Sequence, residues 1–139
     1  MKKILIIEDE ETIRNELKTL LENSGYEVLM LEKFTNAKED IKSMTLDLIL
    51  LDINLPNING EMLLKEIRKE SNIPVIMVTS RVCEVDEVLS MSYGADDYIT
   101  KPYNPTILLL RIQNIFKRME NNRDDLFYDD IVVNPKKGI

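Results

Sequence analysis

Short apolar runs without alternation are the feature of this sequence that most restricts its fold. Leu48–Leu51 is the clearest, and Lys3–Ile7 and Ile73–Thr79 have the same character. A strand with one face in water alternates apolar and polar side chains, whereas a strand covered by helices on both faces is apolar throughout. The runs therefore predict buried strands of a parallel sheet.

Segments with helical spacing separate these strands. Two further strands are predicted at Tyr26–Leu31 and Asp97–Thr100. Helices are predicted from Ile13 to Ser24, from a cap at Thr35 or Asn36 to about Met44, from Met62 to about Glu70, from Val85 to near Gly94, and from Pro105 to about Met119. Five strands alternating with five helices predict an α/β fold with a doubly wound, five-stranded parallel sheet and right-handed crossovers.

Composition narrows the possible functions. The 139 residues suffice for one domain, and 18 basic against 25 acidic side chains give a net charge of -7, which disfavours binding of this fragment to DNA or an anionic membrane. The absence of histidine excludes imidazole nucleophiles, metal ligands and proton shuttles. A single cysteine, Cys83, excludes an internal disulfide and is typical of a cytoplasmic protein. We expect no membrane-spanning segment.

Polar residues follow four of the predicted strands: Glu8 and Asp9, then Asp52, Thr79 and Lys101. If the strands lie in the order 2-1-3-4-5, these side chains meet in one crevice at the carboxyl edge of the sheet. Neighbouring carboxylates repel by about 1 kcal/mol per pair in water and roughly 4 kcal/mol at an effective dielectric constant of 20, so the group needs a cation. Oxygen ligands of this kind favour Mg²⁺ or Mn²⁺.

Asp52 would remain available as a nucleophile, because Mg²⁺ is typically held by only one or two carboxylates. A carboxylate can attack phosphorus to form an aspartyl phosphate, with the metal and Lys101 neutralising charge and the Thr79 hydroxyl donating to a phosphoryl oxygen. Each residue also has a purely structural interpretation: Glu8 and Asp9 could favour the following helix dipole, Thr79 could cap, and Lys101 could be a solvated charge. Because these residues all occur at successive strand ends, their combination favours the functional interpretation.

Several motifs resemble the receiver domain of bacterial two-component response regulators. They are Ile4–Asp9, Asp52 with Leu55-Pro56 and Gly60, Val78–Ser80, and Gly94–Pro102. The resemblance covers about residues 2–119 and implies a flavodoxin-like receiver fold with strand order 2-1-3-4-5.

The resemblance also implies a role for each site residue. Asp52 would accept a phosphoryl group from a sensor histidine kinase, while Glu8, Asp9, Asp52 and the main-chain carbonyl of Asn54 would bind Mg²⁺. Thr79 and Lys101 would contact the phosphoryl group, and Tyr98 would be the switch aromatic that follows Thr79. Such a domain is not an enzyme in the ordinary sense, since it assists only its own phosphorylation and dephosphorylation.

The C-terminal segment resembles the start of another domain. Residues 120–125 are predicted to be a polar connector, and the apolar groups 126–128 and 131–133 to be strands of a truncated winged-helix (OmpR/PhoB-like) DNA-binding domain. The resulting division is a receiver domain at 1–119 and a linker with the start of the second domain at 120–139. DNA would be contacted only through the missing part, as expected of a transcription factor.

That subfamily dimerises through its fourth helix, fifth strand and fifth helix. The corresponding residues here are Leu89, Asp96, Asp97, Ile107, Arg111 and Arg118. Leu89 and Ile107 stand where charged side chains are common, which predicts a dimer face with a more apolar centre.

Three other functions are compatible with parts of this pattern. A haloacid dehalogenase-type phosphatase would need an acid at the position of Asn54, and a flavodoxin-like cofactor binder would need a Ser/Thr/Gly-rich loop where Glu8–Glu11 stand. A receiver that acts as a constitutive, phosphorylation-independent dimer or protein-interaction module stays open as the alternative.

Overall fold

The computed structural model describes residues 1–31, 33–81 and 83–129, with side chains described as far as residue 120. The chain divides into two compact units, Met1–Pro105 and Thr106–Ile139. The first unit carries the sheet and the candidate site.

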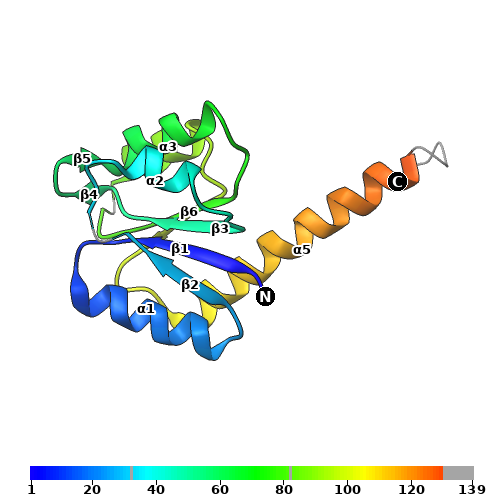
Figure 1. The fold of residues 1–139 in the computed structure, drawn as a ribbon, viewed down its shortest axis with the longest axis horizontal. Helices are drawn as coiled ribbons and strands as arrows, with labels where there is room; N and C mark the ends of the chain where they lie inside the picture. Colours follow the sequence, from blue (N-terminus) through cyan, green and yellow to red (C-terminus); the bar gives the residue numbers. More distant parts are fainter. Residues whose placement is uncertain (32, 82, 130–139) are drawn as a thin grey trace. The chain divides into compact units, whose positions relative to one another are not determined.

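Five parallel strands form the sheet of the first unit (Figure 1). They are β1 (Lys3–Ile7), β2 (Glu27–Met30), β3 (Leu48–Leu51), β6 (Val75–Thr79) and β7 (Asp97–Thr100). The spatial order is β2-β1-β3-β6-β7, which confirms the predicted order 2-1-3-4-5 once two short extra strands are set aside. Every residue of β3 and β6 is buried, as the apolar runs predicted.

Four helices of the first unit follow these strands. They are α1 (Glu11–Asn23), α2 (Ala37–Lys42), α3 (Gly60–Arg68) and α4 (Glu84–Ser92). In Figure 1, α1 lies on one side of the sheet, and α2 and α3 lie on the other. The crossovers therefore place helices on both faces, which leaves the carboxyl ends of the strands as a common edge for polar side chains.

Three predicted elements are shorter than expected, and one element was not predicted. β6 begins at Val75 rather than at Ile73. β2 lacks Tyr26 and Leu31, and α2 ends at Lys42 rather than near Met44. The additional element is a hairpin of β4 (Asn54–Leu55) and β5 (Ile58–Asn59). Its turn contains Pro56 followed by Asn57 at φ +69°, a pairing that suits a type II turn.

The hairpin leads the chain to Gly60, the first residue of α3. The amide of Gly60 donates to the carbonyl of Ile53 at 2.8 Å. A Cβ atom at Gly60 would lie 2.7 Å from Cα of Ile53 and 2.8 Å from the carbonyl carbon of Asp52. Only glycine permits this close approach, so the start of α3 fixes the main chain of Asp52.

α5 (Pro105–Asp129) begins at the predicted proline and continues well past Met119. The predicted strand at 126–128 is therefore wrong for the described residues. Residues 120–125 are helical, and their role as a connector to a second domain stays a prediction. The physical reason is that no glycine or proline stands between Pro105 and Pro135 to end the helix. The predicted strand at 131–133 lies outside the described residues. None of the helices in the described part combines the length and hydrophobicity that a bilayer crossing requires.

Candidate functional site

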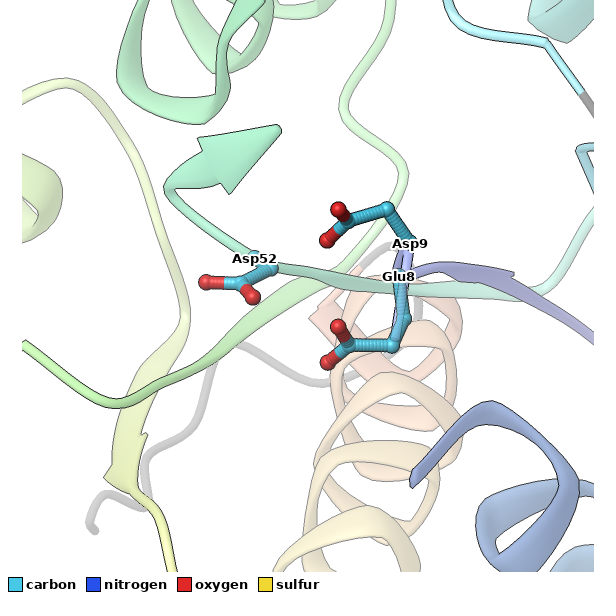
Figure 2. A group of neighbouring side chains, drawn as sticks. All are labelled: Glu8, Asp9 and Asp52. Atoms are coloured by element: carbon cyan, nitrogen blue, oxygen red, sulfur yellow. The ribbon is translucent and has the colours of Figure 1, made fainter. Parts of the chain in front are cut away.

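Three carboxylates meet at the carboxyl edge of the sheet. Glu8 and Asp9 follow β1, and Asp52 follows β3, which pairs with β1 in a register that sets Ile7 beside Leu51. One oxygen of each carboxylate lies within 4.8 Å of the others. In Figure 2 the carboxylates of Glu8 and Asp9 extend toward the side on which Asp52 lies. Glu8 and Asp52 are buried, whereas Asp9 is exposed to solvent.

Lys101 brings a positive charge into this cluster from the end of β7. Its ammonium group donates to Oδ2 of Asp52 at 2.9 Å and also to Oε1 of Glu8. The side chain of Lys101 is only 10% exposed. The position after β7 therefore places the lysine where the sequence predicted, beside Asp52.

The pKa values of the cluster reflect burial as well as charge. Burial raises the pKa of Glu8, and this effect exceeds the opposing effect of its hydrogen bond from Lys101. Burial alone would lower the pKa of Lys101, but its hydrogen bonds to Glu8 and Asp52, together with the attraction of these two carboxylates, raise the pKa. One ammonium group is thus shared between two buried carboxylates, with Asp9 alongside.

The donor set fits a small divalent cation. All three side chains offer carboxylate oxygens, the ligands that Mg²⁺ and Mn²⁺ prefer. In an octahedral shell with Mg²⁺–oxygen bonds of about 2.1 Å, neighbouring ligand oxygens lie about 3 Å apart and opposite ones about 4.2 Å apart. One carboxylate oxygen from each of Glu8, Asp9 and Asp52 lies within 4.8 Å of the other two, so small side-chain rotations would bring them to these separations.

A hollow of about 430 Å³ opens beside the cluster. Its lining residues are Glu8, Asp9, Glu10, Ile13, Asp52, Asn54, Ser80, Lys101 and Pro102. Asn54 lies where the predicted main-chain ligand belongs. Ser80 is a hydroxyl residue to which the sequence interpretation assigned no role, although it stands in the Val78–Ser80 motif.

Thr79 is the last residue of β6 and is fully buried. Its hydroxyl oxygen accepts the amide hydrogen of Arg81 at 3.3 Å, and its carbonyl accepts that of Lys101 at 2.8 Å. The hollow is bordered by Ser80 rather than by Thr79. A contact between the Thr79 hydroxyl and a phosphoryl group stays a prediction.

Arg81 links the site to α4 and β7. Its Nε donates to Oδ1 of Asn54 at 3.0 Å, and a terminal nitrogen donates to Oδ2 of Asp86 at 3.4 Å. The hydroxyl of Tyr98 donates to the carbonyl oxygen of Arg81 at 2.9 Å. Burial, with added repulsion from Asp86 and Glu61, raises the pKa of Tyr98 to about 12. Tyr98 is therefore a neutral donor, attached to the loop that leaves Thr79.

The residues predicted for the dimer face are distributed over both units. Leu89 is half-buried on α4. The carboxylate of Asp96 accepts from Arg68 at 3.0 Å and from the amide of Val75 at 2.9 Å. Asp97 accepts from the amide of Tyr98. The remaining three, Ile107, Arg111 and Arg118, belong to α5. Asp96 thus pairs within its own protomer.

Comparison with known proteins decides the family. Residues 4–113 match the response regulator receiver domain family. The chain belongs to this family. This receiver domain is 39% identical over 133 residues to the sensory transduction protein RegX3 of Mycolicibacterium smegmatis, covering 96% of the chain and 58% of that protein. It is 41% identical over 118 residues to the aerobic respiration control protein ArcA of Escherichia coli, covering 85% of the chain and 50% of that protein.

A solved structure shows the same fold. The BeF3-activated N-terminal receiver domain of RstA from Klebsiella pneumoniae superposes with a TM-score of 0.77 at 31% identity, covering 81% of this chain and 96% of that one. The curated relatives are response regulators of the OmpR/PhoB type, the subfamily that the C-terminal segment was predicted to resemble. This receiver domain spans about half the length of those relatives. Its receiver-domain homologues are signalling proteins rather than conventional enzymes.

Proposed function

We propose that this receiver domain is a phosphorylation-activated switch whose Asp52 accepts a phosphoryl group from the phosphohistidine of a sensor histidine kinase. The observation that supports this most strongly is the hydrogen bond of Lys101 to Asp52 within a group of three carboxylates. A nucleophile, its counter-ion and a set of oxygen ligands thus share one hollow. That combination suits phosphoryl transfer, which requires positioning and charge neutralisation more than covalent help.

In the transfer step, a carboxylate oxygen of Asp52 forms a bond to phosphorus while the bond from phosphorus to the kinase imidazole nitrogen breaks. The imidazole nitrogen retains the electron pair of the broken bond. Lys101 stays beside the new acyl phosphate and offsets its negative charge. Glu8, Asp9, Asp52 and the main-chain carbonyl of Asn54 would hold Mg²⁺ (or Mn²⁺), which when bound neutralises charge on the phosphoryl oxygens.

Phosphorylation would act on the fold through the loop that leaves β6. It adds roughly two negative charges at the end of β3. Hydrogen bonds from Thr79 and Lys101 to that charge would contribute about 1.5 to 3 kcal/mol each. A change in population from 1:99 to 99:1 needs roughly 5.5 kcal/mol, so either hydrogen bond alone would shift the population only partly. Dimerisation would add to the shift by linkage. Tyr98 would move together with this loop, because its hydroxyl donates a hydrogen bond to the carbonyl oxygen of Arg81.

The output would be a homodimer formed through α4, β7 and α5. Leu89, Asp97, Ile107, Arg111 and Arg118 would form its face, with Asp96 as an internal support through Arg68. We propose that a domain following residue 119 contacts DNA and regulates transcription from the cytoplasm. In this division, residues 1–119 are the receiver and 120–139 belong to the linker and the start of that domain.

Two measurements test this function. The chain is incubated with acetyl phosphate and Mg²⁺, and its intact mass is compared with that of Asp52→Asn. We expect the mass of one phosphoryl group to be added to the wild type alone. Light scattering after treatment with beryllofluoride should show a dimer, and Leu89→Asp should weaken it. A wild-type chain that is dimeric without treatment and unchanged by it would instead support the constitutive module.

A further inference from the structure

Arg14 turns back from α1 toward the acidic loop that follows β1. Its NH1 donates to the main-chain carbonyl of Glu8 at 3.1 Å, and a longer contact of 3.5 Å reaches the carbonyl of Asp9. Arg14 is half-buried and contacts no carboxylate of the cluster in the hydrogen bonds of the described residues. Its guanidinium therefore acts on the main chain of the loop rather than on the carboxylate groups themselves.

The loop has little else to define its conformation. Glu10 occupies the N-cap position of α1 but makes no side-chain capping hydrogen bond. The amide of Glu10 donates to the carboxylate of Glu8 at 3.1 Å, whereas within the described part of the chain no main-chain amide donates to the carboxylate of Asp9. The carboxylates repel each other, and Asp9 is exposed, so electrostatics alone would turn it toward solvent.

A side chain leaves the main chain in a direction set by the adjoining peptide planes. The carbonyls of Glu8 and Asp9 belong to the two peptide planes that flank Asp9, so holding them restricts the direction of the Asp9 Cα–Cβ bond and limits rotation of the main chain after Glu8. A guanidinium group suits this task, because it is always charged and presents several donors in one plane. Held in this way, both carboxylates remain turned toward Asp52, as Figure 2 shows.

We propose that Arg14 is a positioning residue for the divalent cation, acting through the main chain of Glu8 and Asp9. The inference rests on the proposed function, because it assumes that these carboxylates bind the cation. The rival explanation is that Arg14 only adds positive charge to a negative region. Lys18 lies one turn further along α1 and offers a matched control, because its replacement removes the same charge from the same helix.

The test measures Mn²⁺ binding by water-proton relaxation in the wild type, Arg14→Gln, Arg14→Lys and Lys18→Gln. Arg14→Gln should weaken binding about tenfold, as is typical when a residue that orients metal ligands is replaced. Arg14→Lys keeps the charge but loses the planar donors, and should still weaken binding by about threefold. Lys18→Gln should change it by less than about twofold. Equal weakening in Arg14→Gln and Lys18→Gln, or none in Arg14→Gln, would overturn the proposal.

A second measurement separates positioning of the cation from a general structural defect. Phosphorylation by acetyl phosphate is followed at limiting and at saturating Mg²⁺. Arg14→Gln should be slow at limiting Mg²⁺ and reach the wild-type rate at saturation, with an unchanged thermal unfolding midpoint in EDTA. A defect that persists at saturation would refute the role of Arg14. Failure of the wild type itself to bind Mn²⁺ would instead refute the proposed function.

Discussion

Replacing Lys101 with methionine tests the charge balance of the acidic cluster. Methionine preserves much of the length and packing of lysine while removing its ammonium group. The side chains of Glu8 and Asp52, both bonded to Lys101, are only 3% and 6% exposed. Removing one partner of a buried ion pair typically costs about 3 to 5 kcal/mol, because a charge stays buried without compensation. We expect the free energy of unfolding in EDTA to fall by about that amount.

Added Mg²⁺ should recover part of this loss. Without Lys101, the two buried carboxylates have no competing cation, so they should bind Mg²⁺ more tightly than the wild type does. Binding to the folded state alone stabilises it by about 2.7 kcal/mol when the ligand is at 100 times its Kd. Urea unfolding followed by circular dichroism, in EDTA and in Mg²⁺, measures both effects.

Lys18→Met provides the control, since it removes a lysine outside the cluster. Its unfolding free energy should change little in either buffer. The reasoning would be refuted if Lys101→Met remained within about 1 kcal/mol of the wild type in EDTA, a change typical of an exposed ion pair. It would also be refuted if Mg²⁺ stabilised the variant no more than it stabilises the wild type.

Three further substitutions test the surroundings of the site. Gly60→Ala should destabilise the fold by about 1 to 3 kcal/mol and slow phosphorylation, because the added Cβ meets the main chain of Ile53 and Asp52. Urea unfolding measures the loss of stability, and intact mass measures the rate of phosphorylation. Arg68→Met should lower the free energy of unfolding by about 2 to 4 kcal/mol in the same assay, because Arg68 donates to the carbonyls of Gly94 and Ile73 and to the carboxylate of Asp96. A loss smaller than that expected from removing an exposed ion pair would contradict this role of Arg68. Burial, followed by repulsion from Asp86, raises the pKa of Glu61 above its ordinary value of 4.5. The protonated carboxyl is then favoured by folding, and this contribution is full below pH 4.5 and is lost as pH rises through the raised pKa. Glu61→Gln should therefore gain stability relative to the wild type at neutral pH and lose that advantage below pH 4.5, and a difference that does not vary with pH would contradict the assignment.

The positions of the site residues followed from the sequence because they depend on strand ends. An unbroken apolar run such as Leu48–Leu51, bounded by turn residues, is typical of a strand covered on both faces, and the residue after such a strand lies at the edge of the sheet. Parallel pairing of β1 with β3, which the assumed strand order 2-1-3-4-5 supplied, then brings Glu8 beside Asp52. The contact of Lys101 with both was expected for the same reason.

Contacts between residues that are far apart along the chain could not be predicted from the sequence. Arg81 donates to Asn54 across 27 positions, and Arg68 ties α3 to the segment before β7. Neither contact produces periodicity or a motif. The β4–β5 hairpin was missed because strands of two residues have no pattern to recognise. The length of α5 was missed because apolar residues at 126–128 suit a helix as well as a strand.

The central claim is that Asp52 is the nucleophile and that a divalent cation enables it to react. Borohydride reduces an aspartyl phosphate to homoserine, so peptide mass spectrometry can locate the modified residue directly. After treatment with acetyl phosphate and Mg²⁺, we predict homoserine at position 52 and nearly none when EDTA replaces Mg²⁺. Homoserine at Asp9 instead, or equal yields at position 52 with and without Mg²⁺, would contradict the account.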